Sequence, residues 1–580
     1  MTEDFRREAE LWGIETEFFD VRGLRHEVPP HTIEKVVAAL SGRGRSPAVV
    51  DASSKAELAH QGDGRRGWIV AAQLYSLRSQ RNWGLGDFTD LAAVIEIAAE
   101  KGAAGVGLNP LHALFGERPV DASPYSPNSR LALNPLYIDV EAIPHFPNCY
   151  VLAIENEFKD RRQADLIDYE AVAKLKWPAL RLAHRTFREL AGATERAEFA
   201  SFCNEGGSTL LRFAAFETLR GKFHTVWWEW PLEWRDPGDD ALRHLAADEA
   251  EEIEFHQFVQ WAAARQLQAC SALANSRGMP IGLYIDLAVG VDASGADAWL
   301  AQDAMLRGIS VGAPPDEFNP AGQDWGLTTF DPHGLVRQDF APFREVLRAA
   351  MRHAGAIRID HVLGLMRMFV IPHGLKPQDG AYLRFPFAAM LNVVAEESRR
   401  CRCIVIGEDL GTVPENFRDI MYRWGLWSYL VMLFEREWDG SFKPPDHYRE
   451  NALATFGTHD MATFSGWMSG YDLDIKRAIG VDPGENDEDR ERSRAALRRA
   501  IGEGRHYLKA IEFLAATATR LVSISLEDVL EMREQINVPG TVLQHPNWRR
   551  RLPVDVETMR SDQRMCDVAD VLRRSGRGIG

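Results

Sequence analysis

Three short apolar runs that end on charged side chains constrain the fold of this chain more than any other feature. They are Ala356–Leu365 (AIRIDHVLGL), Cys403–Gly411 (CIVIGEDLG) and Ala452–Asp460 (ALATFGTHD). Apolar runs bounded by turn signals are typical of buried parallel strands. Because barrel enzymes carry their catalytic groups at the carboxyl ends of such strands, we expect Asp360, Glu408 and Asp460 to meet at one rim.

The rest of the chain alternates between strand-like and helical segments. Strands are expected at Trp68–Leu74, Gly105–Leu111 and Ile281–Ala288, a helix at Thr89–Lys101, and a further segment at Ile524–Leu530. Such alternation is the signature of βα units around a parallel sheet. The sequence therefore predicts an α/β fold, a (β/α)8 TIM-type barrel with a large helical insertion and a small N-terminal helical element.

The domain boundaries follow from changes in this pattern. Helical periodicity at Thr32–Leu40 is followed by a Gly-, Ser- and Asp-rich run, Ser41–Gly67, which reads as a linker. The predicted units are an N-terminal helical element with its linker (1–66), a catalytic barrel (67–560), a mostly helical subdomain inserted in it (144–278) and a C-terminal tail (561–580).

Charge and cysteine content limit the partners and the compartment. The formal net charge of −17 argues against nucleic acid and anionic membranes as partners, since both are polyanionic. The first residues contain no apolar stretch like that of a signal peptide, and no run approaches the ~18 apolar residues of a membrane span. Six scattered cysteines fit reduced thiols, so we expect a cytoplasmic protein.

Acidic groups on neighbouring strands indicate an enzyme that acts on glycosidic bonds. That reaction needs two carboxyl groups in different protonation states, held about 5–5.5 Å apart in a retaining enzyme. Asp360 is the predicted nucleophile, because Arg358 two positions earlier points to the same side of the strand and lowers the carboxyl pKa. Glu408 is the predicted acid/base, because burial raises its pKa. Asp460 is predicted to hold sugar hydroxyls and to stabilise positive charge at the anomeric carbon.

The polarity of their surroundings indicates which aromatic residues contact sugar and which pack the interior. Tyr125 and Trp325 lie in polar loops, where sugar contact is favoured, and Trp83 is left open between sugar contact and packing. The tryptophan-rich run Val226–Trp234 lies in the helical insertion, where packing is favoured. No zinc, calcium, P-loop or linked dinucleotide motif occurs, so no metal or other cofactor is expected.

Several longer motifs resemble those of the amylomaltases, the 4-α-glucanotransferases or disproportionating enzymes of the α-amylase-like barrels. The resemblance covers residues 68–555. Its motifs are QLYSLRSQRNWGLGDFTDL (73–91), SPYSPNSRLALNPLYID (123–139), VGAPPDEFNPAGQDWG (311–326), RIDHVLGL (358–365), GEDLG (407–411), GTHD (457–460), NVPGT (537–541) and HPNWRRR (545–551).

The resemblance implies a role for each matching residue. It makes Asp360 the nucleophile, Glu408 the acid/base and Asp460 the stabiliser of the transition state. The implied substrate-binding residues are Tyr125, Asp286, Gln323, Trp325, Arg358, His361, His459 and Asn537. It also implies that Gly312–Trp325 arches over the cleft, that an α-1,4-glucan or maltooligosaccharide is the donor, and that glucose or a glucan is the acceptor.

Two alternatives to glucan transfer remain open at this point. The catalytic trio by itself is equally compatible with a retaining, amylase-like α-glucan hydrolase, since only an ordered acceptor separates transfer from hydrolysis. A catalytically silent glucan-binding protein is the other alternative. The three acids argue against it, because binding alone does not require all of them.

Overall fold

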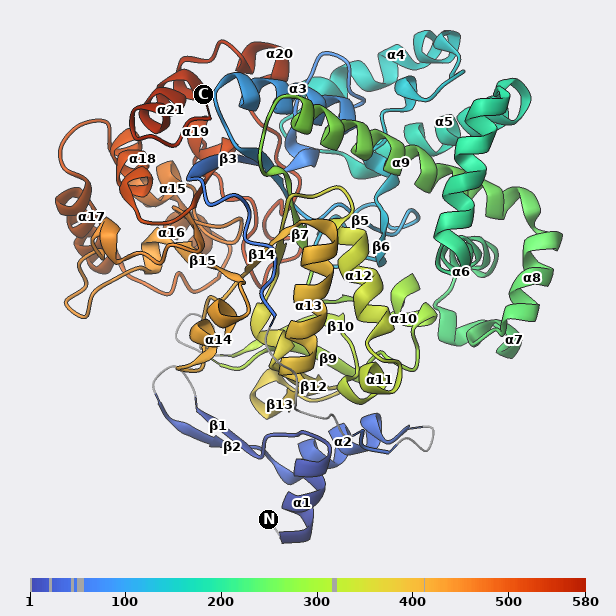
Figure 1. The fold of residues 1–580 in the computed structure, drawn as a ribbon, viewed down its shortest axis with the longest axis horizontal. Helices are drawn as coiled ribbons and strands as arrows, with labels where there is room; N and C mark the ends of the chain where they lie inside the picture. The colour runs from blue at the N-terminus through green and yellow to red at the C-terminus, as the bar shows by residue number, and fades with distance from the viewer. Residues whose placement is uncertain are drawn as a thin grey trace.

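A closed barrel of eight parallel strands forms the body of the protein (Figure 1). The computed structural model describes residues 3–19, 23–42, 46–48, 57–315, 321–411 and 413–579. The barrel strands are β3 (Gly67–Ala72), β4 (Gly105–Leu108), β7 (Gly282–Leu287), β11 (Ala356–Ile359), β14 (Ile404–Gly407), β15 (Trp427–Val431), β16 (Ala452–Thr455) and β17 (Leu521–Ser525). Each strand pairs with the next in chain order, and β17 pairs with β3. The predicted (β/α)8 fold is confirmed.

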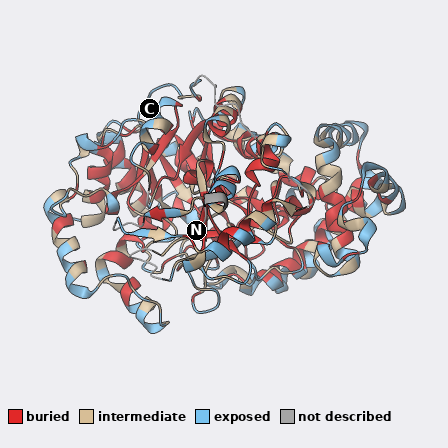
Figure 2. Ribbon diagram, turned by 90° about the horizontal axis from the view of Figure 1, so that it is seen from below, coloured by how far each residue is buried: buried red, intermediate tan, exposed pale blue. Residues whose placement is uncertain are grey.

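Helices cover the outside of the barrel and bury its strands. These helices are α3 (Phe88–Glu100), α12 (Ala341–Met351), α13 (Phe387–Cys401), α14 (Phe417–Arg423), α15 (Phe464–Ser469), α16 (Tyr471–Ala478), α17 (Asp487–Ile501), α18 (His506–Ala516) and α19 (Leu526–Val529). Figure 2 shows buried residues along the strands and exposed ones on the outer faces of the helices. The strands around Asp360, Glu408 and Asp460 lie where they were expected, whereas β15 was not predicted.

A second, antiparallel sheet stands on the carboxyl-terminal side of the barrel and was not predicted. Its strand order is β13-β12-β9-β10-β8. The strands are β8 (Val291–Asp292), β9 (Ile309–Ala313), β10 (Gln323–Thr328), β12 (Arg367–Pro372) and β13 (Ala381–Arg384), with the short helices α10 (Ala296–Leu300) and α11 (Pro332–Arg337) between them. Because all five strands belong to the connections that follow β7 and β11, the sheet overhangs the end of the barrel where the three acids lie.

The predicted helical insertion consists of a run of α-helices between β6 (Ser129–Leu133) and β7. They are α4 (Asn148–Gln163), α5 (Tyr169–Leu190), α6 (Ala193–Phe223), α7 (Leu232–Arg235), α8 (Asp239–Asp248) and α9 (Ala250–Ser276). They lie on the opposite side of the barrel from α17 and α18 (Figure 1). Trp227 and Trp230 of the tryptophan-rich run are buried, as expected for packing, while Trp228 is 44% exposed.

The N-terminal element is not purely helical. Between α1 (Glu3–Leu11) and α2 (Pro30–Leu40), it contains the antiparallel pair β1 (Glu17–Phe19) and β2 (Arg25–Glu27). It packs on the second sheet, where Phe18 contacts the rings of Phe369 and Tyr382. Of the predicted linker Ser41–Gly67, residues 43–45 and 49–56 lie outside the described residues.

The described end of that linker packs against the barrel. The backbone N–H of Ala59 donates to Trp424 O, and Arg66 donates to the carbonyl oxygens of Ala515 and Thr517. The predicted C-terminal tail likewise packs back, after α20 (Val556–Met559), as α21 (Gln563–Arg574) against α18. The end of the linker and the last described residues, Gly578 and Ile579, together line the amino-terminal end of the barrel.

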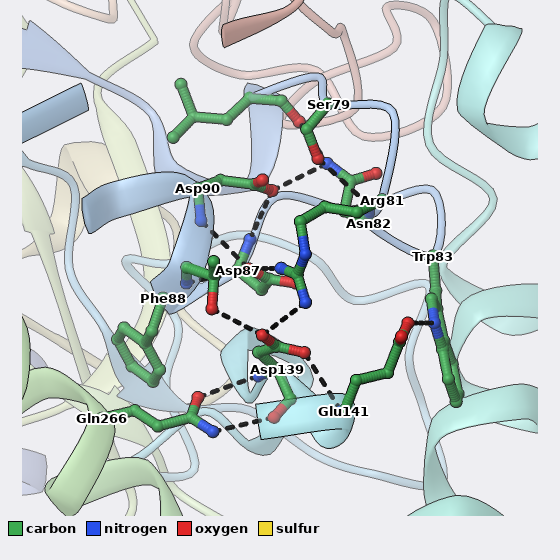
Figure 3. A network of polar contacts seen from close by, with 12 residues as sticks. Ser79, Arg81, Asn82, Trp83, Asp87, Phe88, Asp90, Asp139, Glu141 and Gln266 are labelled. Atoms are coloured by element: carbon green, nitrogen blue, oxygen red, sulfur yellow. Dashed lines mark hydrogen bonds and ion pairs between the residues drawn. The ribbon is translucent and has the colours of Figure 1, made fainter. Parts of the chain in front are cut away.

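A buried polar network ties the first barrel connection to the insertion (Figure 3). Asp139 accepts hydrogen bonds from Arg81 Nη2 at 2.6 Å and from Thr89 Oγ1 at 2.5 Å. Its backbone N–H and carbonyl pair with the side-chain amide of Gln266 on α9. Trp83, left open above, is buried, stacks on Phe158 and donates to Glu141. Trp83 therefore has a packing role in the protein interior.

Replacing Asp139 by alanine should lower the free energy of unfolding by roughly 3 kcal/mol, the lower end for breaking a buried ion pair. The lower end applies because Arg81 is partly exposed and because Asp139 also repels Asp87, whose pKa is raised by burial and by its acidic neighbours. Urea unfolding followed by circular dichroism measures the change. The control Glu170→Gln breaks only the exposed pair with Lys174 and should change stability by less than about 0.5 kcal/mol. Equal effects of the two variants would contradict this account.

Candidate active site

The predicted acids gather where the barrel strands end. Asp360 directly follows β11, Glu408 directly follows β14, and Asp460 lies in the turn after β16. Strands β11 and β14 are neighbours in the barrel, and β7 pairs with β11 on the other side. In that pairing Arg358 lies opposite Asp286. The pairing of β7, β11 and β14 thus brings together four of the residues expected to form a site, namely Asp286, Arg358, Asp360 and Glu408.

Arg358 is the centre of this cluster. It is buried, and its Nη1 donates to both oxygens of Asp286 at 2.8 Å. Its Nη2 lies 2.9 Å from Asp360 Oδ1 and 3.8 Å from Glu408 Oε2. The expected position of Arg358 beside Asp360 is therefore correct. Since one nitrogen reaches both acids, their nearest oxygens are separated by no more than the sum of those two distances. That bound is compatible with the roughly 5–5.5 Å separation of the two carboxyl groups in retaining glycosidases.

The pKa of Asp360 differs from the sequence prediction. Burial raises its pKa to about 6, and the charges of Asp286 and Glu408 add to the increase, although Arg358 opposes it. The arginine does lower the carboxyl pKa, as expected, but the prediction of a net decrease was wrong. Desolvation and two acidic neighbours outweigh a guanidinium that is shared among three carboxylates.

Glu408 is held by backbone groups. Its Oε2 accepts the N–H of His361 and its Oε1 the N–H of Leu410, both at 2.8 Å. Burial raises its pKa, while Arg358 and the two N–H groups oppose the increase. The predicted direction is therefore correct. Gly407, the residue before it, packs so closely that a Cβ would lie 2.8 Å from Val362 Cγ1.

Asp460 and its neighbours form a second hydrogen-bonded group. Asn537 Nδ2 donates to Asp460 Oδ1 at 2.6 Å, and His459 Nε2 lies 3.3 Å from Oδ2. The Asp460 side chain is 45% exposed, and although partial desolvation acts to raise its pKa, His459 and Asn537 lower that pKa below its usual value. Asp460 is thus the most acidic of the three carboxyl groups, while Asp360 and Glu408 titrate higher.

Tyr125 joins the two groups. Its hydroxyl donates to Asp286 Oδ2 at 2.6 Å and lies 3.2 Å from His459 Nδ1. Its ring also stacks on the His459 ring, with the centroids 4.6 Å apart. A pocket at this end of the barrel is lined by Tyr125, Asp286, Arg358, His459 and Tyr429. Four predicted binding residues, two from barrel strands (Asp286 and Arg358) and two from connections (Tyr125 and His459), therefore share one wall.

The second sheet contributes Gln323 and Trp325. Trp325 Nε1 donates to Gln323 Oε1 at 3.0 Å, and the indole meets the His361 ring edge-on at 5.3 Å. His361 was expected to face away unless the strand ended before it. Strand β11 ends at Ile359, and His361 adopts a left-handed backbone with φ 47°. In the predicted arching loop Gly312–Trp325, residues 316–320 lie outside the described residues.

Two aromatic residues of the site were missed. Tyr429 on β15 lies under the Arg358 guanidinium, 5.5 Å from its centre, and its N–H donates to the buried Asp409. Trp548 contacts both Tyr125 and His459. Strand β15 ends on apolar residues and so carried no acidic signal, whereas Trp548 stands in the HPNWRRR motif, which could have identified it.

The described residues contain neither a cluster suited to a metal ion nor a helix suited to a membrane. In this part of the chain, no group of three or more His, Cys, Asp and Glu side chains is arranged to hold a metal ion. No helix there is long and apolar enough to cross a bilayer.

Comparison with known proteins decides the family. A family model described as 4-alpha-glucanotransferase matches residues 72–556. The chain belongs to the 4-alpha-glucanotransferase family. It is 36% identical over 547 residues to the 4-alpha-glucanotransferase of Mycobacterium tuberculosis, which covers 88% of this chain and 75% of that protein. It is 35% identical over 533 residues to the enzyme of Haemophilus influenzae, with 84% and 76% covered.

The fold agrees with a solved structure of the same family. The amylomaltase of Corynebacterium glutamicum superposes with a TM-score of 0.85 and 26% sequence identity, covering 98% of this chain and all of that one. The barrel, the insertion and the N-terminal element thus all fall within the aligned length of this 4-alpha-glucanotransferase family member.

Proposed function

We propose that this chain transfers segments of α-1,4-glucans to the 4-hydroxyl of glucose or of another glucan, with retention of configuration. The observation that carries the proposal is the pair Asp360 and Glu408, both within reach of one nitrogen of Arg358. Such closeness favours a retaining double displacement over single displacement by a water molecule held between two more distant acids. Membership of the 4-alpha-glucanotransferase family supplies the class of substrate.

In the first step, Asp360 attacks the anomeric carbon while Glu408 protonates the departing glycosidic oxygen. Their surroundings suit these roles. Arg358, 2.9 Å away, stabilises the ionised Asp360, and burial keeps Glu408 protonated to a higher pH than a solvated carboxyl group. The products of this step are a glycosyl ester on Asp360 and a free reducing-end fragment.

In the second step, Glu408 takes the proton of an acceptor hydroxyl, which attacks the ester and releases Asp360. The low pKa of Asp460 keeps this group anionic, so it stabilises the oxocarbenium-like transition states of both steps. Tyr125, Asp286, Arg358, His459 and Asn537 surround the donor sugar, and Gln323, Trp325 and His361 lie toward the second sheet, where the acceptor enters.

The choice of a sugar over water requires an acceptor that is already oriented. Holding the acceptor hydroxyl near the ester contributes several kcal/mol, which water in solution does not gain. The edge-on pair Trp325 and His361 offers a rigid aromatic edge beside Glu408, whose Oε2 accepts the His361 N–H. A cytoplasmic location is part of the proposal, because all six cysteines are free thiols, as expected in a reducing compartment.

Incubation with maltotriose tests the reaction. We expect glucose and a ladder of longer maltooligosaccharides by chromatography, with total reducing ends constant, because each cleavage is followed by a new α-1,4 bond. A steady rise in reducing ends would show that water is the acceptor and would make the chain a hydrolase. If neither maltotriose nor longer maltodextrins give any product, transfer is refuted and the chain is a glucan-binding protein.

Replacing Glu408 by glutamine should lower kcat by about 10²–10⁴-fold, the usual contribution of a general acid/base, while glucan binding persists. Single-turnover kinetics and calorimetric titration with maltoheptaose separate the two effects. The matched control is Glu198→Gln, an exposed change of the same kind on α6, which should behave as wild type. Unchanged kcat in the Glu408 variant would remove this residue from the reaction.

The pH profile follows from the pKa of Asp360. The nucleophile must be ionised, so kcat/KM should fall as the pH drops through about 6. Glu408 must be protonated, so kcat/KM should also fall on the alkaline side. Because the charge of Asp286 adds to the increase caused by burial, Asp286→Asn should lower the pKa of Asp360 and move the acid limb to lower pH.

The exposed replacement Asp240→Asn on α8 is the control for this experiment and should leave the limb in place. Profiles normalised to their maxima separate the shift from any loss of substrate binding in the Asp286 variant. An acid limb near pH 4 in the wild type, or one that moves upward in Asp286→Asn, would contradict the proposed electrostatics.

A further inference from the structure

A cavity at the amino-terminal end of the barrel, opposite the active site, shares no lining residue with the active-site pocket. It is lined by the first residues of several strands, by the described end of the predicted linker and by the C-terminal segment. The lining includes Gly67 of β3, Ile404 of β14, Trp427 of β15 and Leu521 of β17. Because it lies between elements that close the barrel, its shape is set by the fold itself.

Basic side chains dominate this cavity. Arg65, Arg66, Arg402, Arg520 and His60 all line it, in a chain whose formal net charge is −17. Two acids offset part of this charge, since Asp63 pairs with Arg65 at 2.6 Å and Glu450 with Arg520 at 3.1 Å.

The remaining two arginines, Arg66 and Arg402, have no acidic counterpart among the residues that the structure describes. Arg66 donates to the carbonyl oxygens of Ala515 and Thr517. No carboxylate in the described part of the chain pairs with Arg402, and burial together with the Arg402 charge lowers the pKa of His60. Like charges held together with too few counter-charges attract an anion.

Two hydrogen-bond donors without a partner among the described residues belong to side chains that line the same cavity. Trp427 is 3% exposed, and its Nε1 has no hydrogen-bond partner among the described residues; the same holds for Arg520 Nε. Buried donors normally find an acceptor, so both point to a missing one. Gly62 and Gly64, with φ of 69° and 79°, turn the chain across the cavity in a conformation that favours glycine. Pro280 and Ile281 add an apolar side.

We propose that this cavity binds a phosphorylated small molecule through its phosphate group. A phosphate carries up to two negative charges and three acceptor oxygens, which match several guanidinium groups better than one carboxylate does. The apolar side then accommodates the carbon skeleton of the ligand. The site does not depend on the proposed glucan transfer, since it shares no residue with the active site.

Calorimetric titration of the full-length protein with inorganic phosphate, glucose 6-phosphate and AMP at constant ionic strength tests the proposal. We expect at least one of the three to bind with a stoichiometry of one and to raise Tm, because a ligand of the native state stabilises it. Tighter binding of the sugar phosphate or of AMP identifies the skeleton that the apolar side selects, and equal affinities show that the phosphate group alone is recognised.

Arg402→Gln should weaken that binding about tenfold, as expected for the loss of one charged hydrogen bond. This variant removes no ion pair from the fold, so it should keep the Tm of the unliganded wild type. The control Arg185→Gln makes the same charge change at an exposed position on α5 and should bind as wild type. No binding of any probe, or binding that survives Arg402→Gln unchanged, would overturn the proposal.

Discussion

The active site depends on one buried positive charge. Burying a guanidinium without partners is very costly, so the Arg358 side chain requires the carboxylates of Asp286 and Asp360 around it. The same carboxylates repel one another, and without Arg358 they would not remain ionised at such short distances. The strand register places Arg358 opposite Asp286, and Asp360 follows Arg358 by two residues in the chain. The barrel therefore fixes the positions on which this balance of attraction and repulsion depends. Structure and charge state are therefore set by the same strand pairing.

Sequence alone predicted the part of this arrangement that follows from short-range pattern. Three strands and their functional ends were located from apolar runs that end on Asp360, Glu408 and His459–Asp460. This was possible because the apolar residues that indicate burial lie next to the charged residues that carry the chemistry. Strand β15 ends on apolar residues and was missed. The antiparallel sheet was missed as well, because β9 pairs with β12 across some sixty residues and neither strand has an alternating pattern.

The pKa of Asp360 could not be predicted for a different physical reason. Its sign depends on how much water the fold removes and on which charges lie nearby in space. Asp286, which raises this pKa, is far away in sequence, and Arg358, which lowers it, is divided among three acids. A local pattern contains the arginine but neither the burial nor the sharing. For Glu408 the predicted direction was correct, because burial is the largest cause of its raised pKa and Asp409 adds to it, against Arg358 and two backbone N–H groups.

The two ends of the barrel carry buried charges of opposite sign, and different elements compensate them. At the carboxyl end, acids from separate strands converge and one arginine offsets part of their charge. At the amino end, Arg577 donates to Gly67 O and Thr517 O, and Arg66 donates to Thr517 O, so two cations bridge the seam where β17 meets β3. Carbonyl oxygens satisfy hydrogen bonds but do not cancel charge, and burial together with Arg66 lowers the pKa of Arg577 to about 9. An anion in the adjoining cavity would relieve that repulsion and strengthen the seam that closes the barrel.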